Sequence, residues 1–187
     1  MEALLVSTGL VAIAEIGDKT MLLAILLAAR FRKPGPILAG ILAATLANHL
    51  LASAVGVLAG GFLQGAWMRW VLGLAFLAFA VWALIPDKFE EKDEPAEVTG
   101  RGVFVTTLIA FFLVEMGDKT QVATVALAAR FHNVFWVAAG TTIGMMIANT
   151  PAVLIGQAAA TKLPLKAIRY CAAAAFAGLG LWILISG

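Results

Sequence analysis

Two short segments of this sequence place acidic and basic side chains inside otherwise apolar stretches. They read EIGDKT at residues 15–20 and EMGDKT at residues 115–120. Each segment offers two carboxylates, one ammonium group and one hydroxyl. Carboxylate oxygens are hard ligands, which suit calcium, manganese or magnesium better than copper or zinc. The two segments therefore predict a divalent-cation site with four candidate ligands: Glu15, Asp18, Glu115 and Asp118.

The charges within these segments do not cancel. Lys19 or Lys119 can neutralise only one of the two carboxylates in its own segment, so each segment keeps one negative charge. Two segments facing each other would carry the charge that one divalent cation neutralises. A purely structural ion network would not need this surplus of acid. We interpret the surplus as a sign of cation binding.

Protons and a cation should compete for such a site. Without the cation, burial and mutual repulsion would favour protonated carboxyl groups. Cation binding would then expel the protons. Competition of this kind is the thermodynamic basis of antiport, and we expect one divalent cation to exchange against about two protons.

The composition places the charged segments in a membrane protein. Of the 187 residues, 62% are hydrophobic and 13% are charged, whereas soluble domains average about 45–50% and about 25%. A net charge of +2 does not favour nucleic acid as a partner, and the single Cys171 excludes a disulfide within the chain. A bilayer core of about 30 Å needs about 20 helical residues. We expect an all-α polytopic membrane protein, surrounded by lipid, with six transmembrane helices at 3–29, 37–63, 67–85, 103–129, 134–160 and 167–185.

The second half of the sequence repeats the first in register. Besides the two charged segments, LAARF occurs at 27–31 and again at 127–131. Each half holds three expected spans, and an odd number makes the second half enter the membrane from the opposite side. We expect one transmembrane domain built as an inverted repeat, with repeat one at 1–85, an acidic linker at 86–101 and repeat two at 102–187. Transporters of this architecture bind their substrate near the midplane.

The loop charges predict the orientation of the chain. Cytoplasmic loops carry an excess of lysine and arginine. Here the side that holds the linker is the richer one, so we expect a cytoplasmic linker, both termini outside, and no cleaved signal peptide. That side carries Arg30, Arg32, Lys33, Lys88, Lys92, Arg101, Lys162, Lys166 and Arg169, against Arg69 and Arg130 on the other.

Several residues near the acids are candidates to support the site. On a continuous helix, Glu15, Asp18 and Lys19 would share one face. Gly17 and Gly117 would permit close helix packing or a local break. A threonine hydroxyl could bond a backbone carbonyl or offer an oxygen to the site. The supporting set is Lys19, Thr20, Lys119, Thr120, Gln121, Asn48, His49 and Asn149, with Thr45 among the other polar residues of the second span.

The doubled pattern E-x-G-D-[KR]-[ST] in a chain with six expected spans resembles the Golgi-type cation–proton exchangers and their small bacterial manganese exporters. The resemblance covers essentially the whole chain. It implies exchange of manganese or calcium against protons, with Glu15, Asp18, Glu115 and Asp118 binding the cation. The cation is then the transported substrate, and no cofactor is implied. The resemblance favours manganese export across a bacterial inner membrane, with a plastid-type organelle as the other location; it leaves a homo-oligomer open.

Three other functions compete with this interpretation. The triplets at 16–18 and 116–118 are similar to the G-x-G-D signature of intramembrane aspartyl proteases, but both copies lack its first glycine. A lysine beside each aspartate would also keep it ionised, so we expect no enzyme. An exporter of another small solute or metal is the second alternative. A channel is the third, and it is weaker because tightly bound ions leave slowly.

Overall fold

The computed structural model describes residues 1–62, 67–85, 102–155 and 164–186, and these residues form helices joined by short connections. The predicted all-α fold is confirmed. The linker at 86–101 and the last residues of the second and fifth expected spans lie outside the described residues. The helices are α1 (Glu2–Glu15), α2 (Lys19–Phe31), α3 (Pro34–Phe62), α4 (Met68–Ala83), α5 (Val103–Glu115), α6 (Lys119–Phe131), α7 (Val134–Ile155) and α9 (Leu165–Ser186).

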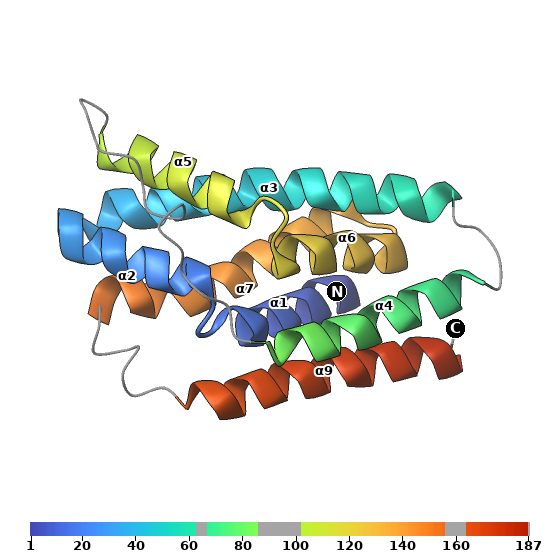
Figure 1. Cartoon of the computed structure of the whole chain (residues 1–187). Coiled ribbons are helices and arrows are strands. Elements are labelled where there is room, and N and C mark those ends of the chain that lie inside the picture. Colours follow the sequence, from blue (N-terminus) through green and yellow to red (C-terminus); the bar gives the residue numbers. More distant parts are fainter. Residues whose placement is uncertain (63–66, 86–101, 156–163, 187) are drawn as a thin grey trace.

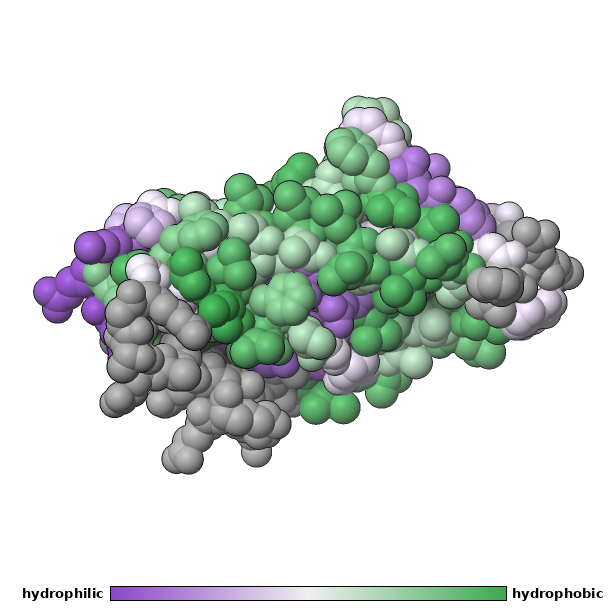
Figure 2. All heavy atoms as spheres, turned by 90° about the horizontal axis from the view of Figure 1, so that it is seen from above, coloured by the Kyte–Doolittle hydropathy of each residue, from purple (hydrophilic) through white to green (hydrophobic). Residues whose placement is uncertain are grey.

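Helices of membrane-spanning length are present in the described part of the chain. Three stretches are long and apolar enough to cross a bilayer, at Pro34–Gly61, Val134–Ile155 and Lys166–Ser186, and two shorter apolar helices are α4 and α5. Large apolar side chains are exposed on their outer faces, including Leu58 and Ile185. Figure 2 shows a largely hydrophobic face between ends where hydrophilic residues gather. Apolar surface of this extent fits a lipid environment.

The first and fourth expected spans are not continuous helices, which corrects the prediction that Glu15 and Asp18 share one helical face. α1 ends at Glu15 and α2 begins at Lys19, and α5 and α6 are separated in the same way. Ile16 has φ −67° and ψ 113°, Gly17 has φ 86°, and the amide of Asp18 donates to the carbonyl of Glu15 at 3.1 Å. These are the features of a type II turn, which needs a positive φ at its third residue.

The second break has the same form. Met116 has φ −63° and ψ 116°, and Gly117 has φ 78°. An added Cβ at Gly117 would meet nothing within 4 Å. Of the two roles that the sequence left open for Gly117, close helix packing or a local break, the structure shows the break. In both segments the glycine is required because a residue with a side chain rarely adopts this backbone conformation.

The helices of the second half run in the opposite direction to their counterparts in the first half. In Figure 1, α2 continues in the direction of α1, whereas α5 and α6 run the other way. α3 and α7 are likewise antiparallel, as are α4 and α9. The main packing partners are α1 with α7, α5 with α3, and α3 with both α6 and α7, while α4 pairs with α9. The acids that flank the two breaks are buried in the bundle, whereas Met116 in the second break is 58% exposed.

Glycines on α3 and α7 allow close approach of the broken helices. A Cβ at Gly56 would lie 2.2 Å from the carbonyl oxygen of Val125 on α6, and a Cβ at Gly140 would lie 2.6 Å from that of Leu4 on α1. Gly144 makes a similar approach to Thr8 of α1. Small residues at helix contacts are typical of membrane helices, because packing replaces the hydrophobic effect as the force that joins them.

Candidate cation site

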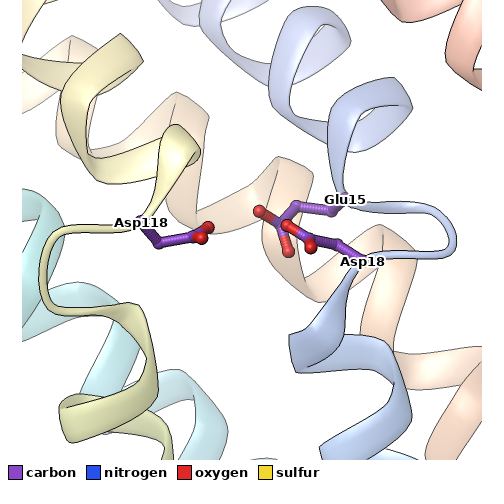
Figure 3. Close-up of side chains that lie close together, drawn as sticks. All are labelled: Glu15, Asp18 and Asp118. Carbon is purple, nitrogen blue, oxygen red and sulfur yellow. The ribbon is translucent and has the colours of Figure 1, made fainter. Parts of the chain in front are cut away.

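Three carboxylates from both halves of the chain meet where the helices break. Glu15 is the last residue of α1, and Asp18 and Asp118 are the N-cap residues of α2 and α6. All three are buried, and one carboxylate oxygen from each lies within 4.8 Å of the others. Figure 3 shows the three side chains pointing toward one another. Glu15 and Asp18 are brought together by the type II turn, which holds its first and fourth residues close.

The start of each second half-helix favours a carboxylate. The Asp18 side chain accepts a hydrogen bond from the backbone amide of Lys19 at 2.7 Å. An aspartate at this position satisfies an amide that has no partner within the helix, and it lies at the positive end of the helix dipole. Asp118 occupies the same position in α6 but makes no capping bond with its side chain. Its carboxylate is turned instead to the other half of the protein.

Glu15 is held by hydroxyl groups from both halves. Thr20 donates to Oε2 at 2.6 Å, and Thr120 donates to Oε1. Both threonines are buried. The sequence left open a bond to a backbone carbonyl or an oxygen offered to the site; in the structure each hydroxyl instead donates a hydrogen bond to the Glu15 carboxylate. The two bonds fix the position of Glu15 between the half-helices.

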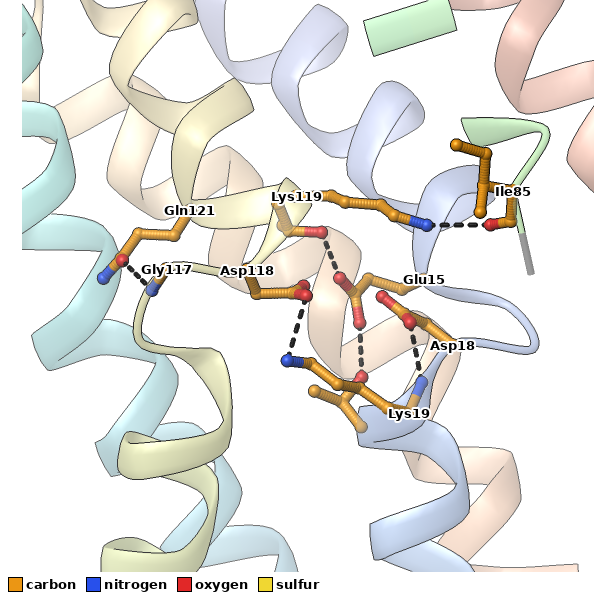
Figure 4. A network of polar contacts seen from close by, with 10 residues as sticks. Glu15, Asp18, Lys19, Ile85, Gly117, Asp118, Lys119 and Gln121 are labelled. Carbon is orange, nitrogen blue, oxygen red and sulfur yellow. Dashed lines mark hydrogen bonds and ion pairs between the residues drawn. The ribbon is translucent and has the colours of Figure 1, made fainter. Parts of the chain in front are cut away.

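An ion pair also joins the two halves at this point. The Lys19 ammonium lies 3.2 Å from Oδ1 of Asp118 (Figure 4). Oδ2 of Asp118 is buried and has no hydrogen-bond partner among the described residues. The cluster thus contains an acceptor oxygen with capacity for a further ligand.

Lys119, the counterpart of Lys19 in the repeat, contacts the end of α4. Its ammonium group donates to the backbone carbonyl of Ile85, just beyond the end of α4, at 3.0 Å, and lies 5.9 Å from the centre of the Trp82 ring. Figure 4 shows Lys119 extended toward Ile85 and Lys19 toward Asp118. The contacts drawn for the two lysines therefore differ between the halves.

Glu115 lies outside the three-acid group, although the sequence predicted four ligands together. It is buried, and both of its carboxylate oxygens accept hydrogen bonds from α3. Thr45 donates to Oε1 at 3.1 Å and Asn48 donates to Oε2 at 3.2 Å. The structure therefore places Asn48 beside an acid, as expected of a supporting residue, and adds Thr45 to the predicted supporting set.

The remaining supporting candidates have other contacts. Gln121 accepts a hydrogen bond from the Gly117 amide at 2.7 Å and so braces the second break. Nδ1 of His49 lies 3.5 Å from the Thr142 hydroxyl, and the Asn149 amide group donates to the carbonyl of Met145 at 3.1 Å. In the described structure these three side chains contact backbone or other helices rather than the three-acid group.

A pocket reaches the site from the ends of α1 and α4 and the start of α9. It contains about 550 Å³ of empty space, including its open mouth. Asp18, Lys119 and Thr120 line it together with residues that the motif did not reveal, among them Phe79, Trp82 and Arg169. Phe79 and Trp82 lie on α4 and Arg169 lies on α9.

Apolar helices that are broken at buried carboxylates, with the breaks of two antiparallel halves facing each other, define a membrane transporter for small ions. Comparison with known proteins supports this assignment to membrane transporters. The family model "Divalent cation/proton antiporter GDT1" matches residues 3–91 and again 103–187, and the chain belongs to this family. Its members transport divalent cations against protons, so the predicted family, the antiporter function and the absence of enzyme activity are confirmed.

Named relatives cover nearly the whole chain. A Vibrio cholerae protein named "Putative manganese exporter" is 50% identical over 177 residues, which cover 94% of this chain and 87% of that protein. "GDT1-like protein 3" of Arabidopsis thaliana is 26% identical over 96% of this chain and 69% of its own length. The protein of the same name from Oryza sativa subsp. indica is 27% identical, with 96% and 72% covered. No solved structure matches the chain at a significant level.

Proposed function

We propose that this antiporter exports manganese in exchange for protons, and that the cation binds between the half-helices to Glu15, Asp18 and Asp118. The observation that carries the proposal is the meeting of these three buried carboxylates, contributed by both halves. A buried group of acids at the membrane midplane is costly unless it binds or exchanges a cation. Glu115 ends the other broken helix and is equally buried, but it lies outside this group of acids.

The charges around the three acids support a divalent cargo. Counted over both segments, the four carboxylates carry four negative charges, and the ammonium groups of Lys19 and Lys119 return two positive charges. The remainder, two negative charges, is neutralised by one divalent cation. The unpartnered Oδ2 of Asp118 supplies an oxygen that can contact the ion without displacing Lys19 from Oδ1.

The same balance accounts for coupling to protons. When the cation leaves, the two negative charges remain in a low-dielectric interior, where uncompensated charge is strongly unfavourable. Binding of protons restores neutrality, and the next cation must expel them. If one cation exchanges against about two protons, the cation-bound site and the proton-bound site have the same net charge. The proton gradient drives export.

Manganese is the favoured cargo for two reasons. The three-acid group offers oxygen ligands, which suit hard divalent cations. Magnesium gives up its bound water reluctantly, so a compact site of protein oxygens disfavours it. The relative that is 50% identical carries a name that specifies manganese export. We place calcium second, because the same oxygen ligands accommodate it.

We further propose that the chain crosses the inner membrane six times as two inverted repeats. α1 with α2 and α5 with α6 would each form one broken span, and α3, α4, α7 and α9 the others. The antiparallel directions in Figure 1 and the two successive matches of the family model support the repeat. The loop charges favour a cytoplasmic linker and external termini.

Transport in proteoliposomes tests the function directly. Purified protein is reconstituted with an imposed pH gradient, and uptake of manganese, calcium and magnesium is measured together with internal pH. We expect manganese to be exchanged fastest, calcium more slowly and magnesium least. Proton movement should reverse when the cation gradient is reversed. Cation flux that leaves the internal pH unchanged would contradict the proposal.

A further inference from the structure

The two glutamates that end the broken helices occupy equivalent positions in the repeat but have different partners. Glu15 accepts hydrogen bonds from Thr20 and Thr120, which follow the two breaks. Glu115 accepts instead from Thr45 and Asn48, both on α3. Only Glu15 belongs to the three-acid group. Since the glutamates are chemically identical, the difference comes from their surroundings.

The contacts of Glu115 with α3 are well defined. The Asn48 amide group has two hydrogens, and both are used, one by Oε2 of Glu115 and one by the carbonyl of Phe112 at 3.0 Å. Asn48 therefore binds the glutamate and the last turn of α5 together. Thr45 lies one turn earlier on α3 and is fully buried. Hydrogen bonds to both oxygens of a buried carboxylate restrict its position strongly.

The corresponding positions in the other half of the protein carry no hydrogen-bond donor. In the repeat register, Thr45 corresponds to Met145 and Asn48 corresponds to Ala148, both on α7. The side chains of Met145 and Ala148 cannot donate a hydrogen bond, and Asn149, the next residue on α7, donates to the carbonyl of Met145 at 3.1 Å. The two donors that hold Glu115 on α3 therefore have no match at these two positions of α7.

We propose that Thr45 and Asn48 are positioning residues that hold the Glu115 carboxylate on α3, so that three carboxylates rather than four bind the cation in this conformation. The inference rests on the proposed function. Glu115 lies close enough to Glu15 and Asp118 for their charges to interact. Because Glu115 is held on α3, fewer carboxylates surround the ion. Cation affinity in oxygen sites rises with the number of charged ligands. A transporter must also release its cargo, which very tight binding would prevent.

Matched variants of the two glutamates provide the first test. Manganese binding to the purified protein in detergent is measured at equilibrium for wild type, Glu15→Gln and Glu115→Gln. We expect Glu15→Gln to weaken binding about tenfold or more, because a charged ligand is lost, and Glu115→Gln to change it less than about threefold. Equal weakening by both substitutions would overturn the inference. A wild-type protein that binds neither manganese nor calcium would instead overturn the proposed function.

Substitution of the donor tests the role of α3 itself. Thr45→Val removes the hydroxyl at nearly constant volume, and Thr45→Ser keeps it as the matched control. Thr45→Val leaves Glu115 with Asn48 as its remaining donor on α3. Held less firmly, Glu115 can add to the cation site, so we expect Thr45→Val to lower the KM for manganese about threefold or more and to lower kcat, because release slows. Thr45→Ser should behave as wild type. An unchanged or raised KM in Thr45→Val would overturn the inference, and Thr45→Ala is the second variant if the valine protein does not fold.

Discussion

Lys19 and Asp118, one hundred residues apart in the chain, form an ion pair of 3.2 Å between the two halves of the protein. The sequence suggested that each lysine would neutralise an acid within its own segment. The observed pair instead makes the charge of the site a property of both halves together. Separating the halves would leave a buried carboxylate without this partner, which is unfavourable in a low-dielectric interior.

The ion pair predicts a coupling between the two residues. Lys19→Met and Asp118→Asn should each lower the thermal stability measured without divalent cations, because each substitution removes one partner of a largely buried pair. The double variant should lose less than the sum, with a coupling energy of about 1–3 kcal/mol. Thermal unfolding of the four proteins in detergent completes the cycle. Strictly additive losses would show that the pair makes no net contribution.

The second turn predicts a conformational requirement at Gly117. Since an added Cβ would meet nothing within 4 Å, the cost of Gly117→Ala comes from its φ of 78° and should be about 1–2 kcal/mol. Gly117→Asn should be milder, because asparagine tolerates this conformation. Gly178→Ala on α9 is the matched control: it also has free space, but in a helix, and should be neutral or stabilising. Equal melting temperatures for the two alanine variants would count against the turn.

Close packing of α3 against α6 predicts a steric requirement at Gly56. An added Cβ would lie 2.2 Å from the Val125 carbonyl, so Gly56→Ala must push the helices apart, at a cost of about 1–3 kcal/mol. Gly61→Ala on the same helix has no atom within 4 Å and serves as the control. The melting temperature of each variant in detergent gives the comparison. A Gly56→Ala protein as stable as Gly61→Ala would show that α3 and α6 are not in close contact.

Competition with protons predicts a steep pH dependence of cation binding. Lowering the pH protonates the carboxylates that bind the ion, so the apparent Kd for manganese should rise as the pH falls. If two protons leave for each cation bound, the Kd changes by up to about a hundredfold per pH unit where both sites titrate. Titrations at several pH values measure this slope. A Kd that stays constant across the acidic range would remove the basis for exchange.

The sequence predicted the helical class, and the four acids that it singled out include the three that meet in the structure. Both results depend on composition and on a polar pattern repeated in register. The sequence left the breaks at Gly17 and Gly117 as one of two possibilities. Apolar residues continue on both sides of each glycine, and a glycine inside an apolar helix is compatible with close packing or with a turn. Only the backbone angles distinguish these possibilities.

The spacing of residues within one segment could not predict which charged side chains form ion pairs. Spacing within one segment indicates which residues could share a helix face, but it says nothing about a partner one hundred residues away, such as Asp118 for Lys19. The separation of Glu115 from the other acids has a counterpart in the sequence. Thr45 and Asn48 have no polar counterparts at Met145 and Ala148, and this difference is visible once the two halves are aligned.

The count of protons released on cation binding tests the central claim most directly. Manganese is added to the purified protein in a weakly buffered solution near neutral pH, and the released protons are measured per cation bound. The account predicts a ratio near two for the wild-type protein, and a lower ratio with weakened binding for Asp118→Asn, because one exchanging carboxylate is lost. Stoichiometric manganese binding without proton release would contradict it.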